Sequence, residues 1–267
     1  MRHLIPFIRR PAVVPLIRLQ GMIAQSGRLG GVLNDAGIGP VIDRAFGRGR
    51  PAAVALVVNS PGGSPAQSSL IAARVRRLAA EKGLRVHAFV EDVAASGGYW
   101  LACAADDIWL DETSVVGSVG VISAGFGFHD LIARHGVERR VHTAGASKGQ
   151  LDPFRPEQPE DVARLEALLA QLHETFKAQV TARRGARLAQ GTDLFTGEVW
   201  IGRKAVELGL ADGIAHAVPK LKELYGDGVK IVPMGPKKGL FRRFGSEIVE
   251  GSLAAVEERA LWARYGL

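Results

Sequence analysis

Ser96 and Lys148 are the residues whose types and surroundings point most directly to chemistry. Ser96 lies in the run Ala94–Gly98, where small neighbours leave its hydroxyl accessible and let backbone N–H groups approach a substrate closely. Lys148 lies among Gly, Ala and Ser residues, and from Val141 to Leu151 the only other ionisable side chain is His142. Burial among uncharged neighbours disfavours a charged amine, so this lysine could act as a base. Together the two residues would form the catalytic dyad of a serine–lysine hydrolase.

Each of these residues also has a structural interpretation. Ser96 could cap the helix that we expect to begin near Gly97, whereas as a nucleophile its Oγ would lie at the positive end of that helix. Lys148 could be a solvated loop lysine. The competing base is His129, which is followed by Asp130. Adjacent residues rarely face each other correctly, so we rank His129 behind Lys148.

A second glycine-bearing turn precedes the serine in the sequence. The segment Asn59–Ser64 contains a Pro-Gly-Gly run and could be an ordinary tight turn. Its functional interpretation is an oxyanion hole, in which Gly62 or Gly63 acts with Gly97. Backbone N–H groups without side chains leave a carbonyl oxygen free to approach.

Strands and helices alternate along the chain, and these elements must position both turns. The predicted strands are Val13–Ile23, Ala52–Val58, Arg85–Val90, Ile108–Leu110 and Val119–Ile122, with a turn over Glu91–Ser96. One predicted helix follows the first turn, with Leu70, Ile71, Val75 and Leu78 facing inward, and a second begins near Ser96. Further helices are predicted over Pro159–Ala186, Gly202–Leu208 and Phe241–Leu267. The alternation predicts βαβ units and a layered α/β fold. Both glycine turns follow strands, where open α/β sheets place their ligand crevices.

The composition argues against several classes of function. The 267 residues carry a net charge of +7, but the basic residues are scattered and not interleaved with aromatic ones, so we expect no nucleic-acid binding. No phosphate-binding loop and no His/Cys cluster with metal spacing occurs, so we expect no cofactor and no metal. Cys103 is the single cysteine, which excludes an intramolecular disulfide, and we expect it to be buried. No segment approaches a spanning helix, so we expect a cytoplasmic protein with at most peripheral membrane contact.

Several motifs follow one another along the chain: Asn59–Gly63, Ala95–Trp100, Val116–Val121, Gly145–Lys148, Phe195–Ala205 and Leu208–Gly213. Taken in this order, they resemble the signal peptide peptidase A family, the S49 serine peptidases. The resemblance runs from about Pro15 to Val218. Several motifs in the same order are far more specific than any one of them.

The resemblance implies a ClpP/crotonase-type layered α/β superfold with repeated ββα units. It implies one domain over residues 1–267, with a core at about 13–218 and a C-terminal extension at 219–267. Ser96 matches the nucleophile, Lys148 the general base and Ser118 the serine that hydrogen-bonds the lysine amine. Gly62 or Gly63, with Gly97, matches the oxyanion-hole turns.

The implied activity is that of a serine endopeptidase. It would hydrolyse peptides, such as signal-peptide remnants or unstructured segments, through an acyl-enzyme. The resemblance to single-domain members implies a homo-oligomeric ring in which Ser96 and Lys148 of one site come from neighbouring protomers, and we favour an octamer.

Two functions of other classes stay open. We expect no N-terminal anchor of the kind that the membrane-bound members have, and the sequence resembles the soluble, single-domain bacterial branch. A crotonase-like acyl-CoA enzyme would share the glycine-lined oxyanion hole without needing a nucleophilic serine. A non-catalytic oligomeric scaffold would use the ring for assembly alone.

Overall fold

A largely parallel β-sheet organises the chain. The computed structural model describes residues 11–25, 32–145, 147–235 and 262–266. The strands are β1 (Val13–Gln20), β2 (Ala53–Ser60), β3 (Arg85–Ala95), β4 (Asp107–Leu110), β5 (Val115–Gly117), β6 (Val199–Ile201), β7 (Gly213–Ile214) and β8 (Lys230–Met234). Their order is β6-β5-β3-β2-β1-β8, with β4 pairing both β3 and β7. Among these described pairings, β5 with β6 is antiparallel and the others are parallel.

Strand β3 changes its partner along its length, and this brings two loops together. Its first part, His87–Val90, pairs with β4, and its last part, Val93–Ala95, pairs with β5. Along its other side it pairs with β2, with a register shift between Val58 and Ser60. The end of β3 therefore lies between the ends of β2 and β5, where their following loops meet.

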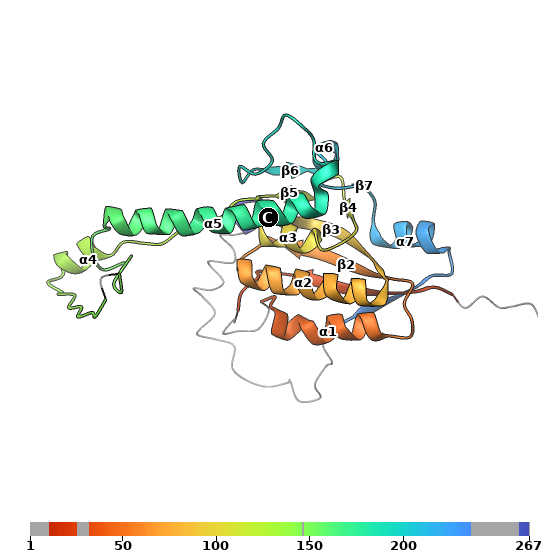
Figure 1. Cartoon of the computed structure of the whole chain (residues 1–267), viewed down its shortest axis with the longest axis horizontal. Coiled ribbons are helices and arrows are strands. Elements are labelled where there is room, and N and C mark those ends of the chain that lie inside the picture. The colour runs from red at the N-terminus through yellow and green to blue at the C-terminus, as the bar shows by residue number, and fades with distance from the viewer. Residues whose placement is uncertain (1–10, 26–31, 146, 236–261, 267) are drawn as a thin grey trace, which may run out of the picture.

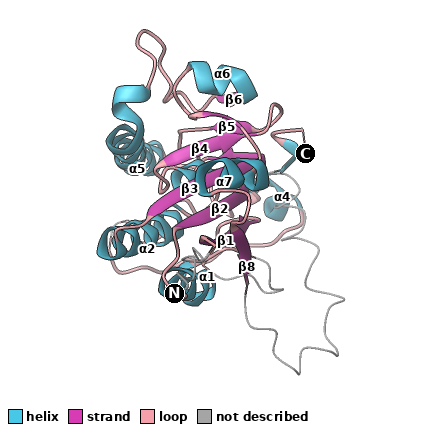
Figure 2. Ribbon diagram, turned by 90° about the vertical axis from the view of Figure 1, so that its right-hand side faces the viewer, coloured by secondary structure: helices cyan, strands magenta, loops and turns pink. Residues whose placement is uncertain are grey.

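The hydrophobic pattern of the strands explains the layers. Every residue of β2 is buried, as expected for a continuous apolar run in a parallel sheet covered on both faces. Val54 and Leu56 face one helical layer, whereas Ala55 and Val57 face α7 on the other side. The helices are α1 (Asp35–Gly47), α2 (Pro65–Lys82), α3 (Gly97–Ala102), α4 (His129–Arg134), α5 (Pro159–Arg184), α6 (Gly202–Glu207) and α7 (Ala217–Tyr225). Figure 2 shows α1, α2 and α5 on one side of the sheet and α7 on the other.

An extended arm leaves this layered body. We define the arm as residues 121–158 together with the N-terminal half of α5, and Figure 1 shows it projecting away from the sheet. No residue of α4 is buried, and α5 buries only Phe176, Val180 and Arg184, all in its second half. Among the described residues, none of the helices combines the length and apolar character needed to cross a membrane.

The predicted layered α/β class is confirmed, but three local expectations are wrong. Residues 91–95 continue strand β3 and do not form a turn. Residues 119–122 form no strand, and the strand in this region is β5. Leu70 is 52% exposed on α2 and does not face the core. The sequence pattern ends β3 too early because Glu91 and Asp92 are charged, yet Glu91 forms an ion pair with Arg18 of β1.

Two further expectations concern single segments. Cys103 is buried as expected, and burial raises the pKa of its thiol to about 12, which makes it unreactive at neutral pH. The predicted helix over residues 241–267 lies outside the described residues except for 262–266, of which Trp262 and Ala263 are helical.

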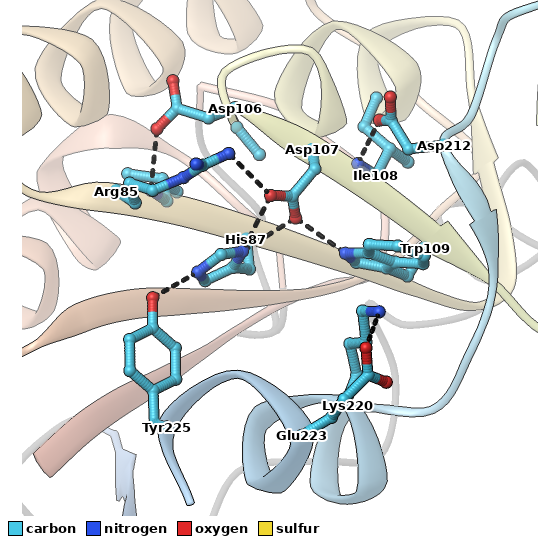
Figure 3. Close-up of polar contacts among 12 residues, drawn as sticks. Arg85, His87, Asp106, Asp107, Ile108, Trp109, Asp212, Lys220, Glu223 and Tyr225 are labelled. Atoms are coloured by element: carbon cyan, nitrogen blue, oxygen red, sulfur yellow. Dashed lines mark hydrogen bonds and ion pairs between the residues drawn. The ribbon is translucent and has the colours of Figure 1, made fainter. Parts of the chain in front are cut away.

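A buried polar network attaches α7 to the amino-terminal end of β3, far from the end that carries Ser96 (Figure 3). His87 is 2% exposed; its Nδ1 lies 2.8 Å from Asp107 Oδ1, and its Nε2 lies 2.7 Å from the Tyr225 hydroxyl. The Trp109 indole also donates to Asp107, at 2.7 Å. Burial raises the pKa of Asp107, but the hydrogen bonds and charge of His87 and the bond from Trp109 outweigh it, so its pKa lies below 3.8.

Asp107→Asn is expected to lower the free energy of unfolding at pH 7 by about 1–3 kcal/mol, because it weakens the partner of a buried imidazole. A carboxylate with a lowered folded-state pKa stabilises the fold above its unfolded pKa and loses that effect as pH falls through the folded value. The difference between wild type and variant should therefore shrink below about pH 3.8. Urea unfolding between pH 3 and 7 measures it. Asp227→Asn, at an exposed site just beyond α7, is the control; an equal loss there would refute the assignment.

Candidate active site

Ser96 lies at the junction of β3 and α3 in a strained backbone conformation. Its φ is +52° and its ψ is −121°, in a region that non-glycine residues rarely adopt. The Ser96 N–H donates to Gly117 O at 2.9 Å, and Trp100 N–H donates to Ser96 O at 3.0 Å. The Ser96 side chain makes no capping hydrogen bond to α3. Ser96 therefore occupies the N-cap position of α3, but capping by its hydroxyl is excluded. Strain held by surrounding structure is characteristic of functional residues.

Glycine is required around Ser96 because three segments approach one another closely. A Cβ atom on Gly62 would lie 2.8 Å from Ser96 Cβ and 2.8 Å from Ala95 O. A Cβ atom on Gly63 would lie 2.0 Å from Ile23 O. Both glycines also have positive φ values, +104° and +135°. The Pro-Gly-Gly turn is thus packed directly against the serine.

Two backbone N–H groups beside Ser96 are free to bind an oxygen. Within the described part of the chain, neither Gly63 nor Gly97 donates its N–H to another protein group. These groups are close, since a Cβ atom on Gly97 would lie 3.4 Å from Gly63 N. The N–H of Gly62, by contrast, donates to Ser60 Oγ at 3.3 Å. The sequence offered Gly62 or Gly63 as the oxyanion-hole donor, and of these two Gly63 has the unoccupied backbone N–H.

Ser118 lies beside Ser96 because β3 and β5 are in register. Ala95 pairs with Gly117, so the residues that follow each strand are neighbours. Ser118 also has a positive φ, +52°, and its N–H donates to Glu198 O. Ser96 and Ser118 line one cavity of about 540 Å³.

The cavity wall is mostly apolar on the side of α3 and α5. Trp100 stacks on Phe176 with ring centroids 5.0 Å apart, and Leu172 lies one turn away on α5. Thr196 and Gly197 close another side. Trp100 and residues 195–205 belong to the family-like motifs of the sequence, which by themselves predict no role for them. Aromatic residues beside a glycine-flanked serine could have indicated a binding wall.

Lys148 does not lie with Ser96 in this chain. It is exposed within the arm, contrary to the expectation that small neighbours bury it. The adjoining Gly149 lines a surface depression with Asp161 and Arg164, near the start of α5. Phe176, which borders the Ser96 cavity, follows Arg164 by 12 residues, or about 18 Å of helix. One protomer alone therefore leaves the serine without this lysine.

His129 also lies in the arm and does not line the Ser96 cavity. Adjacent residues rarely face each other, but here His129 Nε2 lies 3.3 Å from Asp130 Oδ1. The pair is nevertheless exposed, and its position in the arm does not favour it as the base.

Comparisons with known proteins identify the family of the chain. The model of peptidase family S49 matches residues 79–225. The whole chain is 44% identical, over 286 residues, to a Brucella melitensis protein named Na(+)/H(+) antiporter NhaA, of which it spans 39%. It is 32% identical over 204 residues to the Haemophilus influenzae "Probable protease SohB", covering 75% of this chain and 56% of that protein. It is 30% identical over 170 residues to "Serine protease SPPA, chloroplastic" of Arabidopsis thaliana, covering 62% of this chain and 25% of that one.

The family model covers more than half of the chain, including Ser96, Ser118 and Lys148. The chain belongs to peptidase family S49. It spans about two fifths of the length of the antiporter-named relative, whose name describes the longer protein.

Gly62→Ala is expected to reduce any peptide hydrolysis that depends on Ser96 by about a hundredfold or more. The new methyl group displaces Ser96, and a displacement of about 1 Å at a reacting group has effects of this size. It should also lower thermal stability. Gly47→Ala is the matched control, since a Cβ atom there meets nothing within 4 Å. Initial rates and melting temperatures of both variants measure the effect. A fully active Gly62→Ala protein would contradict the close packing of this turn on Ser96.

Proposed function

We propose that this protein is a serine endopeptidase in which Ser96 is the nucleophile and Lys148 of a second protomer is the general base. The observation that carries the proposal is the strained Ser96 beside the free N–H groups of Gly63 and Gly97. A serine at a helix start with two converging N–H donors is the arrangement needed to hold a tetrahedral oxyanion. The family membership and the protease-named relatives support the reaction class.

The residues suggest the following reaction. Ser96 Oγ attacks the carbonyl carbon of the peptide bond while its proton passes to the neutral Nζ of Lys148. The N–H groups of Gly63 and Gly97 bind the oxygen that becomes negative. The lysine then gives the proton to the leaving amine, and an ester on Ser96 remains. Water attacks this ester with the lysine as base, which releases the acid and restores Ser96.

The second protomer is required because the arm carries Lys148 away from the cavity of its own chain. The arm also exposes large apolar side chains that a monomer leaves uncovered, including Ile122 (65% exposed) and Phe126 (81% exposed). Burial of such surface is a main driving force of association. An arm that inserts beside a neighbour's cavity would cover this surface and deliver the amine. In a closed ring, every Ser96 cavity receives Lys148 from a neighbouring protomer in the same way, and the octamer expected from the resemblance is one such ring.

Ser118 is proposed to orient the incoming lysine amine, since it lies next to Ser96 on the rim of the cavity. The apolar wall of Trp100, Leu172 and Phe176 favours substrates with apolar side chains near the cleaved bond. Signal-peptide remnants and unstructured apolar segments fit this description.

Labelling with a fluorophosphonate probe tests the proposal. The probe forms a covalent bond with an activated serine, and peptide mapping by mass spectrometry should locate it on Ser96 of the assembled protein. Labelling at another serine, or none in an assembled protein, would refute the nucleophile assignment. Turnover of acyl-CoA thioesters without labelling would favour the crotonase-like alternative. An unchanged cellular function of Ser96→Ala would favour the scaffold.

A further inference from the structure

The described C-terminal residues, 262–266, pack beside the cleft that contains Ser96. Trp262 and Tyr265 contact an apolar patch formed by Val93, Ala95 and Val115, at the ends of β3 and β5. All three patch residues are buried in this arrangement. Figures 1 and 2 both show the C-terminal end of the chain next to this part of the sheet. The contact joins segments that are far apart in the sequence and lie next to the two serines.

Tyr265 reaches from this patch into the cavity itself. Its hydroxyl lies 3.5 Å from Ser118 Oγ. Arg264 and Tyr265 line the 540 Å³ cavity together with Ser96. They also line the adjoining depression along residues 197–200. A peptide that extends from Ser96 past Ser118 must therefore displace the Tyr265 side chain.

We propose that residues 262–266 are an intramolecular occupant of the substrate cleft, which competes with peptide substrates for the surface beside Ser118. This inference rests on the proposed function of Ser96. Docking of the segment reduces the fraction of sites that are open. The apparent affinity for substrate is the affinity of an open site multiplied by that fraction. The aromatic contacts of Trp262 and Tyr265 stabilise the docked state, and its exposed residues Ala263, Arg264 and Gly266 leave it displaceable.

Tyr265→Ala in the full chain is the first test. It removes the side chain that enters the cavity and leaves Trp262 packed on the apolar patch. We expect KM for an apolar peptide to fall about three- to tenfold with kcat unchanged, because more sites are open. Ala263→Ser, at an exposed position of the same segment, should leave both constants at wild-type values. An unchanged KM, or a lower kcat, in the Tyr265→Ala protein would overturn the proposal.

A binding measurement separates this proposal from the proposed function, since it needs no hydrolysis. The probe is a fluorescently labelled synthetic peptide of residues 262–266. It should bind the Ser96→Ala/Tyr265→Ala protein at least about threefold more tightly than the Ser96→Ala protein, whose own segment occupies the cleft. Equal binding to both proteins, or no binding to either, would overturn the docking. If the double variant binds the peptide more tightly while the wild-type protein hydrolyses no peptide, the docking stands and the catalytic assignment alone is refuted.

Discussion

Ser96→Ala is expected to lower kcat/KM for peptide hydrolysis by about a thousandfold or more, because it removes the atom that forms the acyl-enzyme. The variant should stay folded, and it should melt at or above the wild-type temperature. Its backbone still has to adopt φ = +52°, but no capping hydrogen bond is lost, since the Ser96 side chain makes none to α3. Steady-state rates on a fluorogenic peptide and calorimetry measure both effects.

The matched control for this variant is Ser69→Ala, which removes an exposed hydroxyl from α2. It should retain wild-type kinetics. Residual activity of Ser96→Ala above a few per cent, with no wild-type contamination by mass, would show that another residue attacks the substrate.

Mixed rings of Ser96→Ala and Lys148→Ala protomers are expected to regain activity that neither variant has alone. If the serine comes from one protomer and the lysine from its neighbour, half-and-half mixing leaves about a quarter of the sites with both residues intact. Co-expressed protomers with different tags, purified over both tags and assayed per site, measure this fraction. Confirmed mixed rings without recovered hydrolysis would show that both residues act within one chain.

Two substitutions in the arm sharpen this experiment. Lys148→Arg should be as inactive as Lys148→Ala, because a guanidinium stays protonated and cannot accept the serine proton. Ser147→Ala, the exposed neighbour of Lys148, should leave hydrolysis unchanged and form rings of the same mass. An active arginine variant would exclude Lys148 as the base.

The sequence alone was informative where local pattern decides the structure. The apolar run of β2, the glycine turn after it and the helix that begins after Ser96 were all predicted, because burial and steric limits act over a few residues. The sequence left either Gly62 or Gly63 as the oxyanion-hole donor that acts with Gly97. The hydrogen bond from Gly62 N–H to Ser60 Oγ, which distinguishes them, is visible only in the structure.

The sequence was uninformative where distant segments decide the structure. Strand β3 extends to Ala95 because Arg18 and Asn59, from two other strands, hold its charged residues Glu91 and Asp92. The place of Lys148 depends on how far the arm projects from the body, which no local pattern records. The position of Tyr265 beside Ser118 joins segments separated by 147 positions.

The parallel bridges that tie Ile23 to Leu33 and to Gly63 have a consequence for the nascent chain. The geometry of Ser96 depends on contacts from the loop after β1, the turn after β2 and Gly117 at the end of β5. These contacts span nearly a hundred residues, and such long-range closure comes late in folding. If Ser96 is the nucleophile proposed above, a partly synthesised or partly folded chain lacks the backbone arrangement that activates it. Peptidase activity should then arise only after β1, β2, β3 and β5 have assembled into the sheet.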